Sequence, residues 1–402
     1  PTVADMPFTK IANFSGINNR VDPAKLGLEW QLVAQNTLCD NAQYHVVRPG
    51  YIEFLSDAVD AYGTDDGRLF SVTSADVLLE VASDGSTRQR SLGFTGAPFQ
   101  WTELGYAIFA MSESTSWIIY PDRVVAWGIP TLDSPVVTLT NGSLTAGTYL
   151  SACILIDPYG RQGGCSGISS IQVTDGQGVI ITSPEVAGYT TRAYFSSKNG
   201  KILYSAGNLS GGSITITTTP VEGPRLTTNN YYPPPNNVLI SAQGNRICIS
   251  VWEPEKDRSV LYWSKPGFPH LFDFESNYQI ISGKTTILSQ SQGILLICTD
   301  RSIYSYQPGS PAQQLANYGA FQDTAQRLDS SQIVFWTDRG LCIFPPFENI
   351  TDQVLIPDNR SFSSGALLQH SGSSYFIVSM RGDAAQRPKL NPYIPLAVDV
   401  VS

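Results

Sequence analysis

The sequence predicts an all-β protein, a β-propeller interrupted by an inserted β-sandwich. Three observations lead to this prediction. The chain is rich in turn formers, with 34 glycines and 26 prolines among 402 residues, while 11% of its residues are aromatic and only 15% are charged. Short apolar runs recur about every ten residues. A turn motif also repeats at about the length of one propeller blade. We expect about five to seven blades, some of them irregular.

The first blades are expected between residues 51 and 130. Apolar runs alternate there with turns, and an Asp84-Gly85 pair gives a hairpin signal. The clearest runs lie at residues 68–72, 77–81, 106–110 and 117–120. Short strands at this spacing, grouped in fours, are typical of propeller blades.

A different module is expected from residue 131 to residue 235. It contains about seven alternating strands separated by Gly, Pro and Asn turns, which predicts a β-sandwich. A hairpin that begins near Tyr149 turns at residues 157–161, and a later strand reads Arg192-Ala193-Tyr194-Phe195-Ser196. This order resembles a fibronectin type III or immunoglobulin-like domain. Three consecutive prolines at 233–235 then form a stiff linker out of the module.

The propeller pattern resumes over residues 236–380. Here Asp300-Arg301-Ser302 and Asp338-Arg339-Gly340 each read as a tight turn between paired strands, one blade apart. Residues 1–50 form an N-terminal arm, whose best helical candidate is 28–39. Residues 381–402 form a C-terminal arm that either adds a closing strand to the propeller or reaches a neighbouring subunit.

Charge and hydropathy exclude several classes of protein. The net charge of −9 argues against a protein that grips nucleic acid through its phosphates, because that mode needs a basic face. The sequence contains no apolar run long enough for a membrane-spanning helix and no signal segment, so we expect a soluble chain without membrane insertion.

The six cysteines form no Cys-x-x-Cys pair, and we expect buried free thiols. Cys153 and Cys165 are the one pair placed to face each other across a hairpin.

Residues with catalytic potential are few. The three histidines, His45, His270 and His370, lie in separate contexts, and no hydrolase, metalloprotease or nucleotide-binding motif is present. Propeller glycosidases use carboxylate pairs, for which the candidates are Asp300, Asp338, Asp352 and Asp358. The first two lie in hairpin turns, where Asp is favoured for its own backbone hydrogen bonds. Calcium is conceivable at Asp57, Asp60, Asp65 and Asp66, but no spaced binding loop supports it. We therefore expect a protein that is not an enzyme, without cofactor, metal or catalytic residues.

Two short segments resemble a known protein family. The first is a Gly-Ile-Asn-Asn-Arg turn at residues 16–20 followed by several amides and by Arg48-Pro49-Gly50-Tyr51. The second is the aromatic stretch 262–273, which joins a Trp-Ser strand end to a Pro-His-Leu-Phe-Asp turn. Both resemble the tail tubular protein B, or nozzle, family of short-tailed bacteriophages, which also stabilises packaged DNA.

The resemblance implies a structural virion protein of the phage tail, assembled in the host bacterial cytoplasm. Family members form a homo-hexameric ring, the nozzle or hub, below the portal and the head–tail adaptor. The ring extends the DNA-ejection channel and retains packaged DNA, which passes through the lumen without sequence-specific binding. Outward domains contact tail fibres or other tail proteins. The acidic balance suits a channel wall that a polyanion slides past.

We expect the surface that faces the adaptor or a neighbouring subunit to lie in the first fifty residues. Uncharged amides hydrogen-bond a partner's backbone at a lower desolvation cost than charges, and Arg48 before a rigid proline is placed to pair with a carboxylate. The candidate interface residues are Asn18, Asn19, Arg20, Gln31, Gln35, Asn36 and Arg48.

Two other functions remain open from the sequence. In one, the chain is a tail adhesion protein that binds host carbohydrate through Trp117, Trp127 and Trp263, although each lies in a strand where core packing is the commoner fate. In the other, less favoured, it is a propeller glycosidase.

Overall fold

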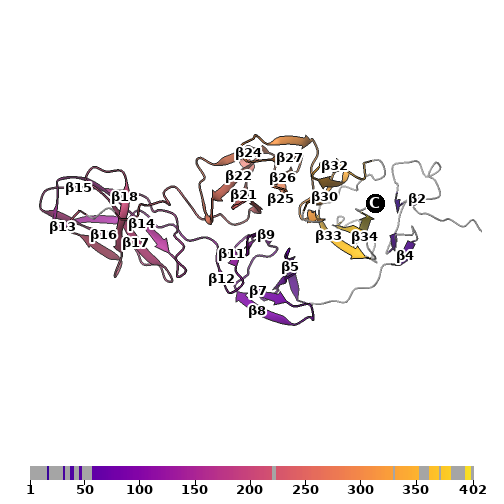
Figure 1. The fold of residues 1–402 in the computed structure, drawn as a ribbon, viewed down its shortest axis with the longest axis horizontal. Helices are drawn as coiled ribbons and strands as arrows, with labels where there is room; N and C mark the ends of the chain where they lie inside the picture. The colour runs from indigo at the N-terminus through magenta and orange to yellow at the C-terminus, as the bar shows by residue number, and fades with distance from the viewer. Residues whose placement is uncertain are drawn as a thin grey trace, which may run out of the picture. The chain divides into compact units, whose positions relative to one another are not determined.

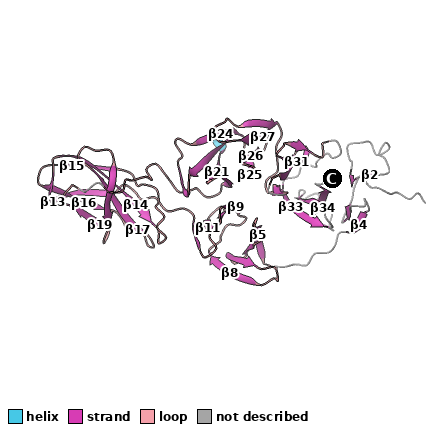
Figure 2. Cartoon of the chain, in the orientation of Figure 1, coloured by secondary structure: helices cyan, strands magenta, loops and turns pink. Residues whose placement is uncertain are grey.

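The computed structural model describes residues 57–219, 223–328 and 331–352, together with the strands β1–β4 and β33–β35 outside these ranges. The chain divides into two compact units. One comprises Asp57–Val251 and Val260–Ile280, and the other comprises Pro1–Ser56, Trp252–Ser259 and Ile281–Ser402. Almost every regular element is a strand (Figure 2). Within the described residues the sole helix is the 3-10 turn η2, Pro254–Lys256.

Two four-stranded antiparallel sheets open the first unit and match propeller blades (Figure 1). The first consists of β5 (Ala58–Gly63), β6 (Leu69–Thr73), β7 (Val77–Val81) and β8 (Thr87–Leu92). The second consists of β9 (Gln100–Leu104), β10 (Ala107–Met111), β11 (Ser116–Ile119) and β12 (Val124–Ala126). In both, strands that follow one another in the chain also pair, as in a propeller blade.

Three further sheets continue this pattern after the inserted module. The third blade contains β20 (Leu239–Gln243), β21 (Arg246–Glu253), β22 (Arg258–Lys265) and β23 (Phe268–Phe272), and β24 (Tyr278–Ser282) also pairs with β22. The fourth contains β25 (Thr285–Ser291), β26 (Ile294–Thr299), β27 (Ile303–Tyr306) and β28 (Gln313–Ala316). The fifth contains β29 (Gln326–Arg327), β30 (Ile333–Thr337), β31 (Gly340–Phe344) and β32 (Glu348–Asn349). These sheets confirm the predicted β-propeller.

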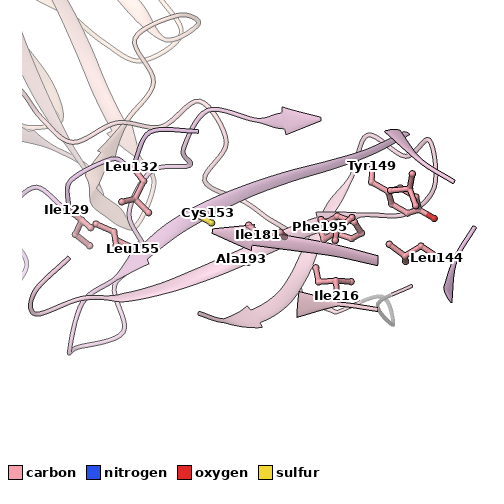
Figure 3. Packing of buried hydrophobic residues seen from close by; sticks show 12 residues of the cluster. Ile129, Leu132, Leu144, Tyr149, Cys153, Leu155, Ile181, Ala193, Phe195 and Ile216 are labelled. Atoms are coloured by element: carbon pink, nitrogen blue, oxygen red, sulfur yellow. The ribbon is translucent and has the colours of Figure 1, made fainter. Parts of the chain in front are cut away.

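The inserted module consists of two sheets that share one core. The first sheet has the order β13-β16-β19, with β13 at Val136–Leu144, β16 at Gln177–Thr182 and β19 at Ser213–Ile216. The second has the order β15-β14-β17-β18, with β15 at Ser169–Val173, β14 at Gly147–Ile156, β17 at Thr190–Ser196 and β18 at Leu203–Asn208. Buried side chains from both sheets form one cluster (Figure 3). In that cluster the rings of Tyr149 and Phe195 stack at 5.2 Å.

The fibronectin type III or immunoglobulin-like topology of this sandwich is not confirmed. In an immunoglobulin domain the first and second strands pair within one sheet. Here the first strand, β13, pairs with the fourth, β16, while the second strand, β14, lies in the other sheet between β15 and β17. Alternation of side chains indicates which segments are strands but leaves their pairing open, so the strand order is known from the structure alone.

The terminal strands settle two expectations about the arms. The helix expected over residues 28–39 is wrong, because β2 (Trp30–Gln31) pairs in parallel with β1 (Gly16–Ile17) and β3 (Thr37–Cys39) pairs with β4 (His45–Val47). Near the other end, β35 (Ile394–Asp399) pairs with β34 (Ser373–Arg381), which pairs with β33 (Phe362–His370). The C-terminal segment therefore adds a strand to a sheet.

Five cysteines in the described residues are free and buried, as predicted: Cys153, Cys165, Cys248, Cys298 and Cys342. Burial raises the pKa of the Cys153 and Cys165 thiols to about 11, so both are protonated at neutral pH. No described helix is long and apolar enough to cross a membrane.

Candidate functional site

The best-defined polar site in the described residues is the place where the sandwich meets the propeller, which we call the joint. It brings together the turn that follows β14, at residues 157–162, the end of the second blade, at residues 123–127, and Pro269 and His270 on β23 of the third blade. All three segments lie in the same unit.

Arg161 forms the centre of the joint. Its Nε donates to Asp157 Oδ2 at 2.7 Å, its Nη2 donates to the carbonyl of Ala126 at 2.8 Å, and its Nη1 lies 3.4 Å from the carbonyl of Trp127. The side chains of Arg161 and Asp157 are only 15% and 4% exposed. The other carboxylate oxygen, Asp157 Oδ1, accepts from the amides of Tyr159 and Arg161 at 3.0 and 2.8 Å. Each buried charge thus has several partners, the condition under which a buried ion pair is tolerated.

Trp127 connects the second blade to the third. Its side chain is fully buried and packs on Phe109 and Phe272 at ring distances of 5.0 and 6.3 Å. The indole Nε1 donates to the carbonyl of Pro269 at 2.9 Å. Since a buried indole N–H needs an acceptor, this bond fixes the ring, and with it the Trp127 carbonyl that Arg161 approaches.

His270 ties the third blade to the turn of the sandwich. Its Nε2 lies 3.0 Å from the carbonyl of Gln162, and the residue is 4% exposed. A carbonyl only accepts, so Nε2 carries the proton and donates. Burial, helped by the positive charge of the nearby Arg161, lowers the pKa of His270 to about 4, so the ring is neutral at neutral pH.

A second arginine, Arg123, reaches from the second blade to the sandwich turn. The Arg123 guanidinium, from the second blade, lies over the ring of Tyr120 at 4.6 Å and over the ring of Tyr159, from the sandwich turn, at 4.7 Å. Its Nη1 also pairs with Asp122 at 2.8 Å. Cation–π contacts of this kind hold the turn against the blade.

Two adjacent glycines allow the backbones to approach at the joint. A Cβ on Gly164 would overlap the carbonyl of Tyr231, and one on Gly163 would lie 2.6 Å from a methyl group of Ile129. Any side chain at Gly164 would therefore push away the segment through which the chain leaves the sandwich.

The joint is suited to mechanical coupling. Its histidine, its buried carboxylate and both arginines are engaged in contacts that hold the sandwich turn on two blades. Sequence reasoning missed this role. The turn Asp157-Pro158-Tyr159-Gly160-Arg161 was visible, but the carbonyls that Arg161 binds are 34 and 35 positions away in the chain.

The predicted interface residues fall almost wholly outside the described residues. Asn18, Asn19, Arg20, Gln35, Asn36 and Arg48 lie there, and only Gln31 is placed, on β2 opposite Ile17. The interface of the N-terminal arm stays a prediction.

The structure places the other candidates in architectural roles. Trp127 and Trp263, which the carbohydrate-binding alternative would use, are 0% and 5% exposed, and Trp117 stacks on Phe94 at 5.2 Å. Asp300 and Asp338 lie in hairpin turns between β26 and β27 and between β30 and β31.

The remaining acidic candidates do not form a metal site in the described residues. Asp60 Oδ2 accepts from the Phe99 amide at 2.7 Å and from Trp101 Nε1 at 3.1 Å, and Asp66 pairs with Arg68. Asp57, Asp65 and Asp352 are exposed, and Asp358 lies outside the described residues. Over the described ranges, no three His, Cys, Asp or Glu side chains are grouped to hold a metal ion.

Comparisons with known proteins identify no family. No protein-family profile and no curated protein matches the chain. Similar solved structures include apo AztD from Citrobacter koseri, BBS1N in complex with ARL6DN, and Hsv2 from Kluyveromyces lactis, all β-propeller proteins. They are 11%, 10% and 7% identical, with TM-scores of 0.37, 0.33 and 0.31. Each of the three matches covers 85% of this chain, and they cover 89% of the AztD chain, 92% of the BBS1N chain and 97% of the Hsv2 chain.

Proposed function

We propose that this chain is a structural protein of a bacteriophage tail. Six copies form a ring, the nozzle, below the portal and the adaptor, which extends the DNA-ejection channel and retains packaged DNA. The role is non-enzymatic and needs no cofactor. The motifs at residues 16–20 and 48–51 and the stretch 262–273 support this family assignment.

The joint is the structural observation that carries the proposal. A ring that anchors other tail parts through an outward domain must pass force between that domain and its wall. A domain on a flexible linker cannot do this. Here a buried ion pair, a buried histidine and a cation–π contact tie the sandwich to two blades. Such contacts favour a domain with a set orientation over a freely tethered one.

Charge supports the channel role. The chain carries 34 acidic and 25 basic residues. Binding to DNA phosphates gains free energy when basic side chains release counterions, and an acidic wall gives no such gain. DNA therefore slides through an acidic ring without being held by its wall.

The proposed partners follow from this arrangement. The N-terminal arm, with Arg20, Gln31 and Arg48 among its candidates, contacts the adaptor or the neighbouring copy. The sandwich presents the surface for tail fibres or other tail proteins. The protein is located in the virion and is assembled in the host cytoplasm.

The test is co-expression with the portal and adaptor proteins of the same phage, followed by electron microscopy of the purified complex. We expect a six-fold ring attached below the adaptor. Particles with Arg48→Ala should package DNA but lose it, while particles with Arg88→Ala, an exposed arginine on β8, should retain it. Failure to join the adaptor, together with saturable binding to host glycans, would favour the adhesion function instead.

A further inference from the structure

The repeated Asp-Arg turn is built in the same way in two consecutive blades. In the fourth blade, Thr299 Oγ1 donates to the carbonyl of Ser302 at 3.0 Å and accepts from the amide of Arg301 at 3.3 Å. In the fifth, Thr337 Oγ1 donates to the carbonyl of Gly340 at 2.7 Å and accepts from the amide of Arg339 at 3.1 Å. Both turns therefore hold their arginine backbones in the same way.

The aspartates of the two turns also act alike. Asp300 exchanges hydrogen bonds with Lys284, the residue before β25, through its amide at 2.9 Å and its carboxylate at 3.0 Å. Asp338 exchanges the same two bonds with Gly319, ahead of β29 in its own blade, at 3.1 and 3.0 Å. Each carboxylate thus accepts from a backbone amide of its own blade, and Asp300 also pairs with Arg301 of its own turn at 3.3 Å.

The two arginines differ. Arg301 donates through Nη1 and Nη2 to the two oxygens of Asp257, each at 2.8 Å, in the parallel geometry that suits a guanidinium and a carboxylate. Asp257 belongs to the corresponding turn of the preceding blade, where the extra 3-10 turn η2 lengthens the connection and ends on Asp257. This carboxylate raises the pKa of Arg301 above its usual value.

Arg339 has no such acceptor among the described residues. The preceding turn, at residues 299–302, is tight and carries no additional carboxylate beyond Asp300. Arg339 is exposed and forms no ion pair with any described residue, whereas its backbone is fixed by Thr337 and by Asn349, whose Nδ2 donates to the Arg339 carbonyl at 2.8 Å. The turn therefore fixes the backbone from which the Arg339 side chain extends into solvent.

We propose that Arg339 binds a carboxylate of the neighbouring copy of this chain, in the two-point geometry that Arg301 shows with Asp257. The repeat indicates the chemistry of the occupant, because the same turn already binds a carboxylate one blade earlier. The neighbouring copy is the source because a closed ring brings a different face of an acidic chain against this one. The inference thus rests on the proposed ring.

Zero-length cross-linking of the ring complex tests this contact. In an Arg339→Lys variant, a carbodiimide joins the amine at position 339 to a carboxylate that touches it, and mass spectrometry identifies the carboxylate. Rings assembled from mixed nitrogen-15-labelled and unlabelled copies show whether the link joins two copies. We expect a link between copies, to one aspartate or glutamate. A link within one copy, a link to the adaptor or no link from position 339 would overturn the proposal.

Charge variants give a second readout. Because a hydrogen bond to a charged group is lost and two like charges are brought together, Arg339→Glu should lower the fraction of chain in rings about tenfold or more at equal concentration. The matched variant Arg88→Glu, also exposed and without an ion pair among the described residues, should leave it unchanged. Equal ring fractions for Arg339→Glu and the native chain would overturn the proposed Arg339 contact but would leave the proposed ring unaffected. Absence of rings in the native complex would instead refute the proposed function, and this contact with it.

Discussion

Replacing Arg161 by alanine should release the sandwich from the propeller. The substitution removes the ion pair to Asp157, whose side chain is 4% exposed, and the bonds to the carbonyls of Ala126 and Trp127. Removal of one partner of a buried pair costs about 3–5 kcal/mol, since the remaining charge is left uncompensated. Asp157 keeps two backbone amide donors, so we expect a loss near the lower limit, about 3 kcal/mol.

Urea unfolding followed by tryptophan fluorescence measures this loss, because the buried Trp127 lies at the joint. Hydrogen exchange should show faster exchange in residues 157–162 and at Ala126. The control is Arg192→Ala, in which an arginine on β17 loses a hydrogen bond to Asn208, made at 2.9 Å near the surface, but no ion pair. Its cost should stay within about 0.5 kcal/mol.

A second variant separates buried charge from lost packing. If the cost comes from the unpaired carboxylate of Asp157, then Asp157→Asn should recover part of the stability in the Arg161→Ala background, because an amide carries no charge to compensate. Equal losses for Arg161→Ala and Arg192→Ala, or no recovery with Asp157→Asn, would show that the ion pair does not hold the joint.

Three further predictions concern the same region. The folded state keeps His270 neutral, with a pKa of about 4 against an ordinary 6.5, so its stabilising contribution is complete above pH 6.5 and falls by about 3 kcal/mol as the pH drops to 4. His270→Gln should flatten the pH dependence of the unfolding free energy between pH 4 and 6.5, and an unchanged slope would contradict this. Gly164→Ala should cost about 3 kcal/mol or more in urea unfolding because its Cβ meets the Tyr231 carbonyl, whereas Gly63→Ala, with nothing within 4 Å, should be nearly neutral. A Gly/Ser linker in place of residues 135–230 should leave the propeller soluble and cooperatively folded, because the shortened chain retains Tyr232, which pairs with Phe272. Aggregation of the shortened chain would count against the sandwich as a separable insertion.

Local sequence patterns predicted the strands but left their pairing open. Alternation and turn residues identify the strand around Tyr149 and the strand that contains Phe195, and the structure stacks the two rings. The Asp300 and Asp338 turns were also recognised, because their spacing of one blade is a property of the sequence itself. The helix expected over residues 28–39 was wrong. The apolar residues there have helical spacing, but the structure pairs Cys39 with His45 in a short sheet.

The joint could not be read from the sequence for a different physical reason. Its hydrogen bonds join residues far apart in the chain, such as Trp127 and Pro269, separated by 142 positions. No local preference records such a contact. What the sequence does contain is a polar turn with both an aspartate and an arginine, and burial of both side chains is decided only when the blades assemble around them.

The strand order of the sandwich explains why this turn can serve as an anchor. β14 lies inside its sheet, bonded to β15 on one side and to β17 on the other, and the turn with Asp157 and Arg161 follows directly from its end. A central strand is held by two ladders, so it resists local opening better than an edge strand does. β17 is held in the same way between β14 and β18, so the turn emerges from the interior of its sheet. In the immunoglobulin order the second strand would lie in the other sheet beside the first, and the turn after it would follow a different set of neighbours. The observed strand order therefore supports the joint as a firm attachment point between the sandwich and the propeller.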